Sequence, residues 1–285
     1  MTAPSPSPKI PVTVVVPVKN EERNLPKCLS RLGRFAEVVV VDSGSTDRTE
    51  AIAREAGAEY LLFKWDGHFP KKRNWVLMHR AFNTPWILFL DADEYVDEAF
   101  VNELAAVLPN STHDGYWIQY SNYFMGKELR HGSPMRKLAL IRSGAGMYER
   151  IDENEWSKLD MEVHEHPVLK GTVGALRATV EHNDYKGLHA YIARHNDYSS
   201  WEAARHAKLM STPEAWADFT PTQRKKYRSL SRWWLAPAYF VHSYIVKRGF
   251  LDGCAGLAFA IMKAIYFFQI RLKIVERRAS SVPSK

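Results

Sequence analysis

The sequence predicts an open, mostly parallel α/β sheet, and two observations lead to this fold class. First, apolar runs of strand length recur in the first third of the chain, at residues 12–18, 37–41, 60–63 and 86–90. Such unbroken runs, rich in Val, Ile and Leu, are typical of strands buried on both faces. Second, the segments between these runs have apolar residues at helical spacing, which predicts right-handed crossover connections.

The connecting segments also have helix boundaries. Residues 20–32 carry acidic residues early and apolar residues at helical spacing, and Gly33 ends this helix. Residues 45–56 open with Ser-Thr-Asp, a common helix start, and Gly57 follows them. A further helix is expected at about residues 71–81. The alternation of strand and helix is therefore complete up to the fourth strand.

The pattern changes in the second half of the chain. Short alternating segments with glycine and aromatic residues between 115 and 180 predict an antiparallel extension, and helical spacing returns at about 188–209. We expect a disordered lead-in at residues 1–9, because Ser and Pro alternate there without the apolar run of a signal peptide. An α/β domain at residues 10–210 and a helical C-terminal region at 211–285 complete the predicted organisation.

Composition limits the partners and the compartment. A net charge of +7 indicates an anionic partner, which could be nucleic acid, an anionic lipid surface or a phosphorylated substrate. Much of the excess lies late in the chain between apolar stretches, which favours a membrane surface over nucleic acid. Cys28 and Cys254 lack metal-ligand spacing, so neither a disulfide framework nor a zinc site is indicated, and a cytoplasmic location fits.

The C-terminal region is apolar but interrupted by charges. A charged residue at the centre of a lipid-spanning helix costs about 2.5 to 3.5 kcal/mol. At 100° per residue, five polar residues fall within one arc of about 80°: Asp252, Lys263, Tyr266, Lys273 and Arg277. We therefore expect an amphipathic helix in the plane of a membrane, with an oligomer interface as the alternative and a true span as the least favoured arrangement. Trp233 and Trp234 would suit the headgroup layer.

Three polar clusters follow the ends of predicted strands, at residues 19–21, 42–45 and 91–94. The carboxyl ends of parallel strands meet at one edge of a sheet, where ligands of such folds bind. Within the last cluster, Asp91 and Asp93 form an Asp-x-Asp pair that can bind a hard divalent cation, which in turn neutralises a diphosphate. The alternative is that these acids only cap the following helix.

Four motifs give these clusters a family context: 12–22 (VTVVVPVKNEE), 38–49 (VVVVDSGSTDRT), 72–74 (KRN) and 86–94 (WILFLDADE). In order and approximate spacing they resemble the family-2 glycosyltransferases with a GT-A fold, specifically over about residues 10–108 and more loosely to about 204. The resemblance implies a Rossmann-like GT-A domain and inverting transfer from a nucleotide-diphosphate sugar, with a UDP-sugar favoured. The signature Gln-x-x-Arg-Trp of processive synthases is absent, which favours single-sugar addition.

The resemblance also assigns roles to the nucleotide side of the site. Pro17, Val18 and Glu21 would lie at the base and ribose, with Asp42 hydrogen-bonding the base. Asp91 would face the ribose or the metal.

The same resemblance places the diphosphate groups. Asp93 would ligate the Mg²⁺ or Mn²⁺ that bridges the diphosphate, and Lys72 or Arg73 would lie near the sugar-phosphate, where a cation stabilises the leaving group. The alternative for the two basic residues is a solvated helix face. His182 could reach the metal or a phosphate, as a late-chain histidine does in some GT-A enzymes, although a lone histidine is more often structural.

Inverting transfer needs a base that deprotonates the acceptor hydroxyl. The segment 160–166 (DMEVHEH) is the densest acidic and histidine cluster outside the nucleotide motifs. It looks like the His-Glu element of lipopolysaccharide-core members of the family, which points to Glu165. Asp160 and Glu162 compete for this role, and a surface strand of ordinary polar residues is the alternative.

Together these features predict a metal-dependent hexosyltransferase acting in envelope polysaccharide synthesis. Its acceptor would be lipid-linked or of lipopolysaccharide type, and it would be peripheral on the cytoplasmic face of the inner (plasma) membrane, with no nucleic-acid partner and with homo-oligomerisation through the C-terminal region possible. A polyprenyl-phosphate sugar synthase, whose acceptor is already anionic, is one alternative. A non-catalytic nucleotide-binding scaffold is the other.

Overall fold

The computed structural model describes residues 8–132, 134–151, 157, 159–162, 165–216 and 219–280. The expected lead-in therefore lies outside the described residues, except for Pro8 and Lys9. The described chain forms two compact units. The first contains the residues up to Tyr123 together with 134–151, 159–162 and 165–185, and the second contains 124–132, 157, 186–216 and 219–280.

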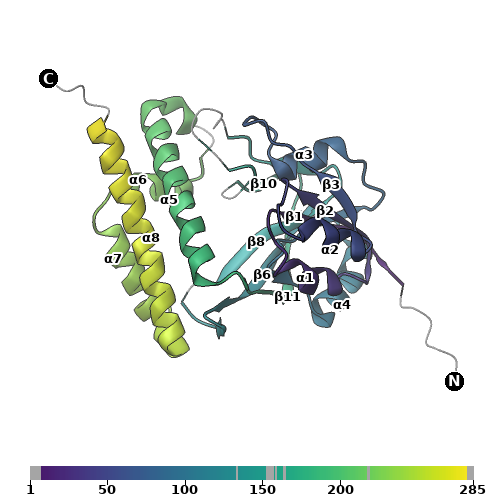
Figure 1. Cartoon of the computed structure of the whole chain (residues 1–285). Helices are drawn as coiled ribbons and strands as arrows, with labels where there is room; N and C mark the ends of the chain where they lie inside the picture. Colours follow the sequence, from purple (N-terminus) through teal and green to yellow (C-terminus); the bar gives the residue numbers. More distant parts are fainter. Residues whose placement is uncertain are drawn as a thin grey trace. The chain divides into compact units, whose positions relative to one another are not determined.

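The first unit is built on one mixed sheet with the strand order β3-β2-β1-β4-β8-β6-β11-β5 (Figure 1). These strands are β1 (Ile10–Val18), β2 (Phe35–Asp42), β3 (Glu59–Leu62), β4 (Trp86–Phe89), β5 (Glu94–Tyr95), β6 (Gly115–Phe124), β8 (Met135–Arg142) and β11 (Val173–His182). Strands β1 to β4 pair in parallel, whereas β8 runs antiparallel to both β4 and β6. The predicted α/β class with an antiparallel extension is confirmed. A separate antiparallel pair joins β9 (Gly146–Tyr148) to β10 (Pro167–Leu169).

Four α-helices belong to this unit: α1 (Leu25–Ser30), α2 (Thr49–Glu55), α3 (Lys72–His79) and α4 (Glu98–Val107), and the 3₁₀ turn η1 (Leu108–Asn110) follows α4. The first two begin several residues later than predicted, because the polar residues before them form loops at the sheet edge. Helix α4 is the helix that the capping alternative placed directly after residues 91–94, but it begins only at Glu98, so neither Asp91 nor Asp93 is its cap. Its signal is Asp97, whose side chain accepts a hydrogen bond from the backbone N–H of Phe100 and so caps the helix.

Side chains of β1 alternate between two cores. Val14, Val16 and Val18 pack in the core that includes α1 and α4, and Val15 packs on the opposite face of the sheet with Val76 of α3. Burial on both faces explains the unbroken apolar run of this strand. The charged and polar loops therefore follow the ends of the central strands, and the buried hydroxyl of Thr13 within β1 is satisfied by Glu37 and Thr84.

The second unit is helical. Its elements are β7 (Lys127–Leu129), α5 (Gly187–Ser211), η2 (Pro213–Trp216), α6 (Pro221–Ser229), α7 (Leu235–Phe240), the π-helical η3 (Val241–Val246), η4 (Gly249–Asp252) and α8 (Gly253–Ser280). Figure 1 shows α5 and α8 side by side as the two long helices. Their shared core includes Ala203, Leu209, Tyr266 and Ile270. This packing places α5 with the C-terminal helices, so the unit begins before α5 and not at the expected residue 211.

Among the described residues, one helical stretch, residues 249–280, is long and apolar enough to cross a membrane by length and composition. That property alone is weak evidence for a span, because core helices of soluble proteins share it. Only 22% of its most apolar window is buried, however, so α8 is not an ordinary core helix.

Candidate functional site

The polar clusters predicted at strand ends meet at one edge of the sheet. The parallel registers bring Val18 at the end of β1 opposite Asp42 at the end of β2. On the other side of β1, Val15 pairs with Phe89, two residues before Asp91. The edge therefore presents the predicted nucleotide-binding residues together, as the parallel-sheet argument required.

The residues expected at the nucleotide base are held tightly by the protein. Asp42 is fully buried, and its Oδ1 accepts hydrogen bonds from the backbone N and the hydroxyl of Ser45 at 3.0 and 2.7 Å. Its Oδ2 accepts from the Tyr60 hydroxyl at 2.9 Å. The side chains of Pro17 and Val18 are buried as well. A nucleotide bound at this edge would thus contact the backbone of β1, or would replace Ser45 or Tyr60 as a hydrogen-bond partner of Asp42.

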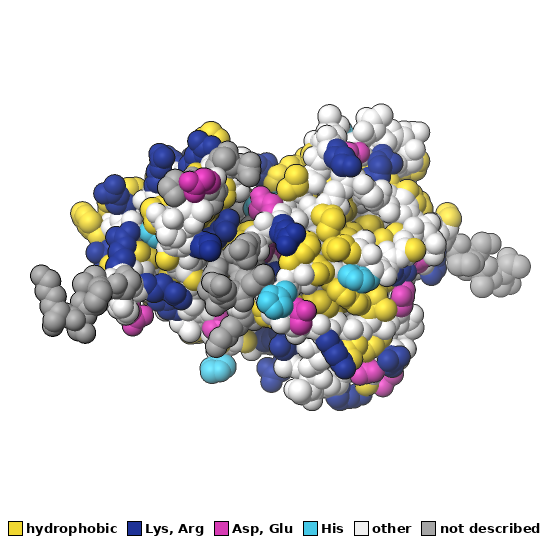
Figure 2. Space-filling model, turned by 90° about the horizontal axis from the view of Figure 1, so that it is seen from above, with side chains coloured by type: hydrophobic (Ala, Val, Ile, Leu, Met, Phe, Trp, Pro, Cys, Tyr) yellow, Lys and Arg dark blue, Asp and Glu magenta, His cyan; other side chains and the backbone are white. Residues whose placement is uncertain are grey.

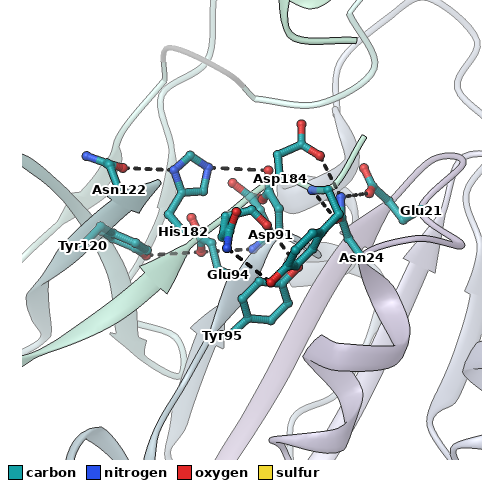
Figure 3. A network of polar contacts seen from close by, with 12 residues as sticks. Glu21, Asn24, Asp91, Glu94, Tyr95, Tyr120, Asn122, His182 and Asp184 are labelled. Carbon is teal, nitrogen blue, oxygen red and sulfur yellow. Dashed lines mark hydrogen bonds and ion pairs between the residues drawn. The ribbon is translucent and has the colours of Figure 1, made fainter. Parts of the chain in front are cut away.

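Glu21 is tied to a second polar network, which Figure 3 shows beside the end of β11. Its Oε2 accepts a hydrogen bond from Asn24 Nδ2 at 2.9 Å, and the same amide donates to Asp184 Oδ1 at 3.0 Å. The backbone N of Glu21 donates to the Thr49 hydroxyl at 2.8 Å. Asn24 and Asp184 were not predicted, because they come together only when β11 closes on the sheet.

Three consecutive basic residues at the start of α3 contact three different carboxylates. The pairs are Lys71–Glu165 at 3.0 Å, Lys72–Asp160 at 3.6 Å and Arg73–Asp91 at 2.6 Å. The side chains of Lys71 and Lys72 are only 7% and 3% exposed, and that of Arg73 is 11% exposed. The alternative of a solvated helix face is therefore wrong. Lys72 also donates to the carbonyl oxygen of Val18 at 2.8 Å, and burial lowers its pKa.

Glu162 holds the first turn of α3. Its two carboxylate oxygens accept from the backbone N–H groups of Arg73 and Asn74, at 2.9 and 3.0 Å, and the Arg73 guanidinium donates to the Glu162 carbonyl. These N–H groups have no partner inside the helix, so a carboxylate satisfies them and complements the helix dipole. Burial raises the pKa of Glu162. Of the three candidate bases, Glu162 is the one committed to helix capping.

Glu165 lines a small pocket on the same unit. Its carboxylate is 2% exposed and pairs with Lys71. The aromatic rings of Trp65 and Phe69 and the imidazole of His68 line the pocket with it.

Asp91 lies between two cations. Its Oδ1 is bound by Arg73, and its Oδ2 lies 2.7 Å from Lys137 Nζ. Lys137 also pairs with buried Glu94, whose Oε2 accepts from the backbone N of Asp91 and from the Tyr120 hydroxyl. Burial alone would raise the pKa of Asp91, but Lys137 and Arg73 outweigh it and hold the pKa well below its usual range. Lys137 was missed because nothing in the local sequence of β8 marks it.

His182, at the end of β11, faces Asp93. Its Nε2 lies 3.5 Å from Asp93 Oδ2, and its Nδ1 lies 3.0 Å from Asn122 Oδ1 (Figure 3). An amide oxygen only accepts, so Nδ1 carries a proton in this arrangement and the lone pair of the neutral ring lies on Nε2. Burial lowers the pKa of His182, but Asp93 outweighs it, so the pKa lies above its ordinary value.

The described residues contain no group of three or more His, Cys, Asp and Glu side chains arranged to hold a metal ion. Both carboxylate oxygens of Asp91 contact cations of the protein, so Asp91 is engaged elsewhere. The other two expected ligands, Asp93 and His182, face each other. Adjacent ligands on one octahedral ion with bonds of about 2.1 Å lie about 3 Å apart, which is close to the separation of this pair. The 3.5 Å separation of Asp93 and His182 is thus compatible with two ligands of one divalent cation.

Comparisons with known sequences identify the family of the chain. The family described as Glycosyl transferase family 2 matches residues 13–164. The lipopolysaccharide core biosynthesis glycosyltransferase LpsC of Rhizobium meliloti is 29% identical over 95% of this chain and 94% of its own length. An uncharacterized glycosyltransferase of Rickettsia conorii is 22% identical over 96% of this chain and 92% of its own.

Similar solved structures are more distant. S. aureus TarS 1–349 in complex with UDP-GlcNAc is 15% identical, with a TM-score of 0.46 over 96% of this chain and 93% of that one. Glucosyl-3-phosphoglycerate synthase from Mycobacterium tuberculosis in complex with Mn²⁺ and UDP-glucose is 23% identical, with a TM-score of 0.32. The match covers 39% of this chain and 43% of that one. Likenesses of this size do not define where a ligand binds in this chain.

Proposed function

The chain belongs to glycosyltransferase family 2, and on that premise we propose that it transfers one sugar, with inversion, from a UDP-sugar to a lipid-linked or lipopolysaccharide-type acceptor. The observation that carries this proposal is the convergence at one sheet edge of the pair Asp93 and His182 with the cations of α3. The similarity to LpsC over nearly the whole of both chains supports the acceptor class.

On the donor side, Asp93 and His182 would hold Mg²⁺ or Mn²⁺, which when bound neutralises charge on the diphosphate leaving group. Asn122 orients the imidazole so that Nε2 points at Asp93, as outer hydrogen-bond partners of metal ligands do. Asp91 acts by fixing Arg73 and Lys137 at the same edge. The nucleotide would lie against Pro17, Val18, Glu21 and Asp42, with Lys72 beside the sugar-phosphate.

On the acceptor side, Glu165 is the proposed base. Its carboxylate takes the proton of the acceptor hydroxyl as that oxygen forms a bond to the anomeric carbon. The bond from this carbon to the diphosphate breaks on the opposite face, and its electron pair leaves with the diphosphate. Lys71 is a positioning residue, because its short charge-assisted contact fixes the carboxylate in the pocket.

Exchanging Glu165 for Gln tests this assignment. We expect Glu165→Gln to reduce sugar transfer by about 10²- to 10⁴-fold, the usual contribution of a general base, and to leave UDP affinity unchanged. Glu149→Gln, in the lining of the same pocket, is the matched control and should keep most of the activity. Full turnover of Glu165→Gln with a bound metal would favour a polyprenyl-phosphate sugar synthase. UDP binding by the unaltered protein without donor hydrolysis or transfer would favour a scaffold.

The buried ion pair calls for a stability control. Glu165→Gln removes the carboxylate charge beside buried Lys71, which destabilises the protein independently of catalysis. The double variant Lys71→Met/Glu165→Gln removes both charges, so its midpoint of urea unfolding should recover. Its transfer rate should not recover. Recovery of both would assign the pair a purely structural role.

We further propose that the enzyme works as a peripheral protein on the cytoplasmic face of the plasma membrane, where a lipid-linked acceptor is available. The basic C-terminal region and the apolar helix α8 support this location. The product's anomeric configuration, read by NMR with a defined acceptor, tests inversion separately from location.

A further inference from the structure

Helix α8 has a continuous apolar stripe on its surface. Six large apolar side chains recur along it every three or four residues, each between 37% and 47% exposed: Leu257, Ile261, Ile265, Phe268, Leu272 and Val275. At 100° per residue these six positions fall within an arc of about 80°. With a rise of 1.5 Å per residue, the stripe is about 27 Å long. A patch of this extent on a soluble surface marks an interaction site.

The opposite face of α8 is packed and carries both apolar and polar side chains. Tyr266 is buried, with its ring 5.5 Å from that of His195 on α5 in an edge contact. The Lys273 ammonium donates to the Asn196 carbonyl at 2.8 Å and to the Ser199 hydroxyl at 2.8 Å, both on α5. The arc of polar residues predicted for this helix is thus largely its inner face. The same inner face carries buried Ile270 and Ile274, so α8 has apolar side chains both in its core and in the exposed stripe.

We propose that this stripe docks on an anionic lipid surface, with α8 lying in the plane of the membrane. Charge complementarity selects this occupant. From residue 186 to the C-terminus the sequence holds 17 Lys and Arg against 6 Asp and Glu, whereas the first 185 residues hold 22 against 26. Figure 2 shows many Lys and Arg side chains on the left-hand part of the surface. A second copy docked through α8 would instead bring two strongly basic units together.

Side chains near the stripe suit an interface between lipid and water. Trp233 and Trp234, which precede α7, are 71% and 43% exposed. Exposed tryptophans are enriched at the level of lipid headgroups, where an apolar ring with one polar N–H is favoured. Lys247 and Arg248, between η3 and α8, add positive charge beside exposed Phe250.

The packing of α8 favours the in-plane orientation over a span. A spanning α8 would take its partner α5 into the hydrocarbon layer. Helix α5 carries buried Glu202, which pairs with Lys226 at 2.6 Å, and further charged residues such as Asp197. Burying such groups in lipid is costly, so the helix pair is suited to lie on the surface with only the stripe immersed.

Cys254 offers a probe at the start of the stripe. It is exposed and lies one turn before Leu257, while Cys28, the other cysteine of the chain, is fully buried. An environment-sensitive fluorophore on Cys254 of the full-length protein should shift to the blue with vesicles of phosphatidylcholine and phosphatidylglycerol. Vesicles of phosphatidylcholine alone should give a much smaller shift, because a neutral surface does not attract the basic unit electrostatically.

Depth measurements separate the two membrane orientations. Single labels at position 254, and at 265 and 275 through Ile265→Cys and Val275→Cys in a Cys254→Ser background, are quenched by lipids that carry quenchers at shallow or deep positions. In-plane docking predicts similar, shallow quenching at all three positions. Deep quenching at position 265 with shallow quenching at 254 and 275 would identify a span and overturn the proposal.

Paired substitutions test the stripe itself. We expect Ile261→Ser/Ile265→Ser to weaken partition onto anionic vesicles by at least about ten-fold, because two large apolar side chains leave the interface. Met78→Ser/Val168→Ser is the control, since these side chains in the first unit are 52% and 60% exposed, and it should partition as the unaltered protein does. Unchanged binding of the stripe variant overturns the proposal. So does a Cys254 signal that responds to protein concentration and not to vesicles, which would identify a second copy. Donor hydrolysis by the same proteins is measured in solution without vesicles. A loss of vesicle binding with unchanged hydrolysis then bears on the docking proposal and not on the proposed transferase function.

Discussion

The sheet edge of the first unit and helix α8 of the second unit place charge in opposite ways. At the sheet edge, Arg73, Asp91, Glu94 and Lys137 are bound to one another, and Glu94 at the centre of the network is only 1% exposed. Along α8, polar groups also lie inward, but apolar side chains occupy the surface that water contacts. Both arrangements oppose the usual preference of soluble proteins for charge outside and apolar groups inside.

Each of these two regions lowers the stability of the free protein in a way that a function can explain. A buried ionic network costs desolvation energy and holds its groups in one geometry, which suits a site that must stabilise a charged leaving group. An exposed apolar stripe gains stability only when a partner covers it. Variants that act on one region and leave the other intact sharpen this comparison.

The largest expected effect is on catalysis at the sheet edge. We expect Asp93→Asn to lower sugar transfer by about 10³-fold, because it removes the negative charge that would hold a divalent cation at the diphosphate. Transfer is measured at saturating Mn²⁺ with a UDP-sugar donor. Asp97→Asn is the control, since Asn caps a helix as well as Asp does and α4 should be unaffected. Equal activity of both variants would remove Asp93 from the site.

The next effect is on stability at the same edge. Lys137→Met leaves Glu94 buried without its ion pair and removes one of two cations from Asp91, so the free energy of unfolding should fall by about 3 kcal/mol. Urea unfolding measures this. Lys27→Met, at the partly exposed Lys27–Glu181 pair, should cost only about 0 to 1 kcal/mol. Similar losses in the two variants would contradict a special ionic network.

A matched pair of substitutions tests which face of α8 is inside. Ile270 is fully buried against α5, whereas Ile265 is 41% exposed. Ile270→Ala should therefore cost about 2 to 4 kcal/mol of unfolding free energy, and Ile265→Ala less than about 0.5 kcal/mol. Unfolding is followed in the absence of lipid. The reverse order would mean that α8 packs through its apolar stripe.

The smallest effect is a pH dependence within the second unit. Asp252 accepts hydrogen bonds from the backbone N of His131 at 3.0 Å and from its Nδ1 at 3.0 Å. Burial would raise the pKa of Asp252, but the bonds from His131 outweigh it, so the pKa lies below its ordinary value. A lowered pKa means that the ionised group stabilises the fold above about pH 4, the unfolded pKa, and that this contribution is lost as the pH falls through the folded pKa.

Asp252→Asn should accordingly lower the Tm at pH 7, with a loss of about 1 kcal/mol. The difference in Tm between the variant and the unaltered protein should shrink as the pH is lowered from 5 towards 3. Thermal unfolding at several pH values measures it. A difference that stays constant over this range would show that the charge of Asp252 contributes nothing.

Local pattern was sufficient for the strands and for the candidate site motifs. Nearly continuous apolar runs mark β1, β2 and β4, because a strand buried on both faces has few positions that face water. Asp91 and Asp93 follow β4 directly, so their place at the sheet edge followed from the chain itself. Their assignment to the metal and the nucleotide stays a prediction.

Local pattern was insufficient where a residue's partner comes from a distant segment. Lys137 on β8 and Asn122 on β6 reach the site only because these strands join the sheet beside β4 and β11. Neither residue has a neighbour in sequence that indicates its role. The sequence of α3 likewise shows three basic residues, and only the packed structure turns them from a solvated face into partners of three carboxylates.

The same division holds for α8. Its amphipathic spacing is a property of the sequence, because a fixed 100° per residue decides which side chains share a face. Which face turns inward depends on the helix it packs against. The face that carries Ile270 and Lys273 packs on α5, where Lys273 donates to Asn196 and Ser199, and the apolar stripe is left at the surface. The order of residues along the chain is thus enough to predict the family, the parallel strands and the amphipathic character of α8, whereas packing sets the partner of each side chain and which face of α8 is buried.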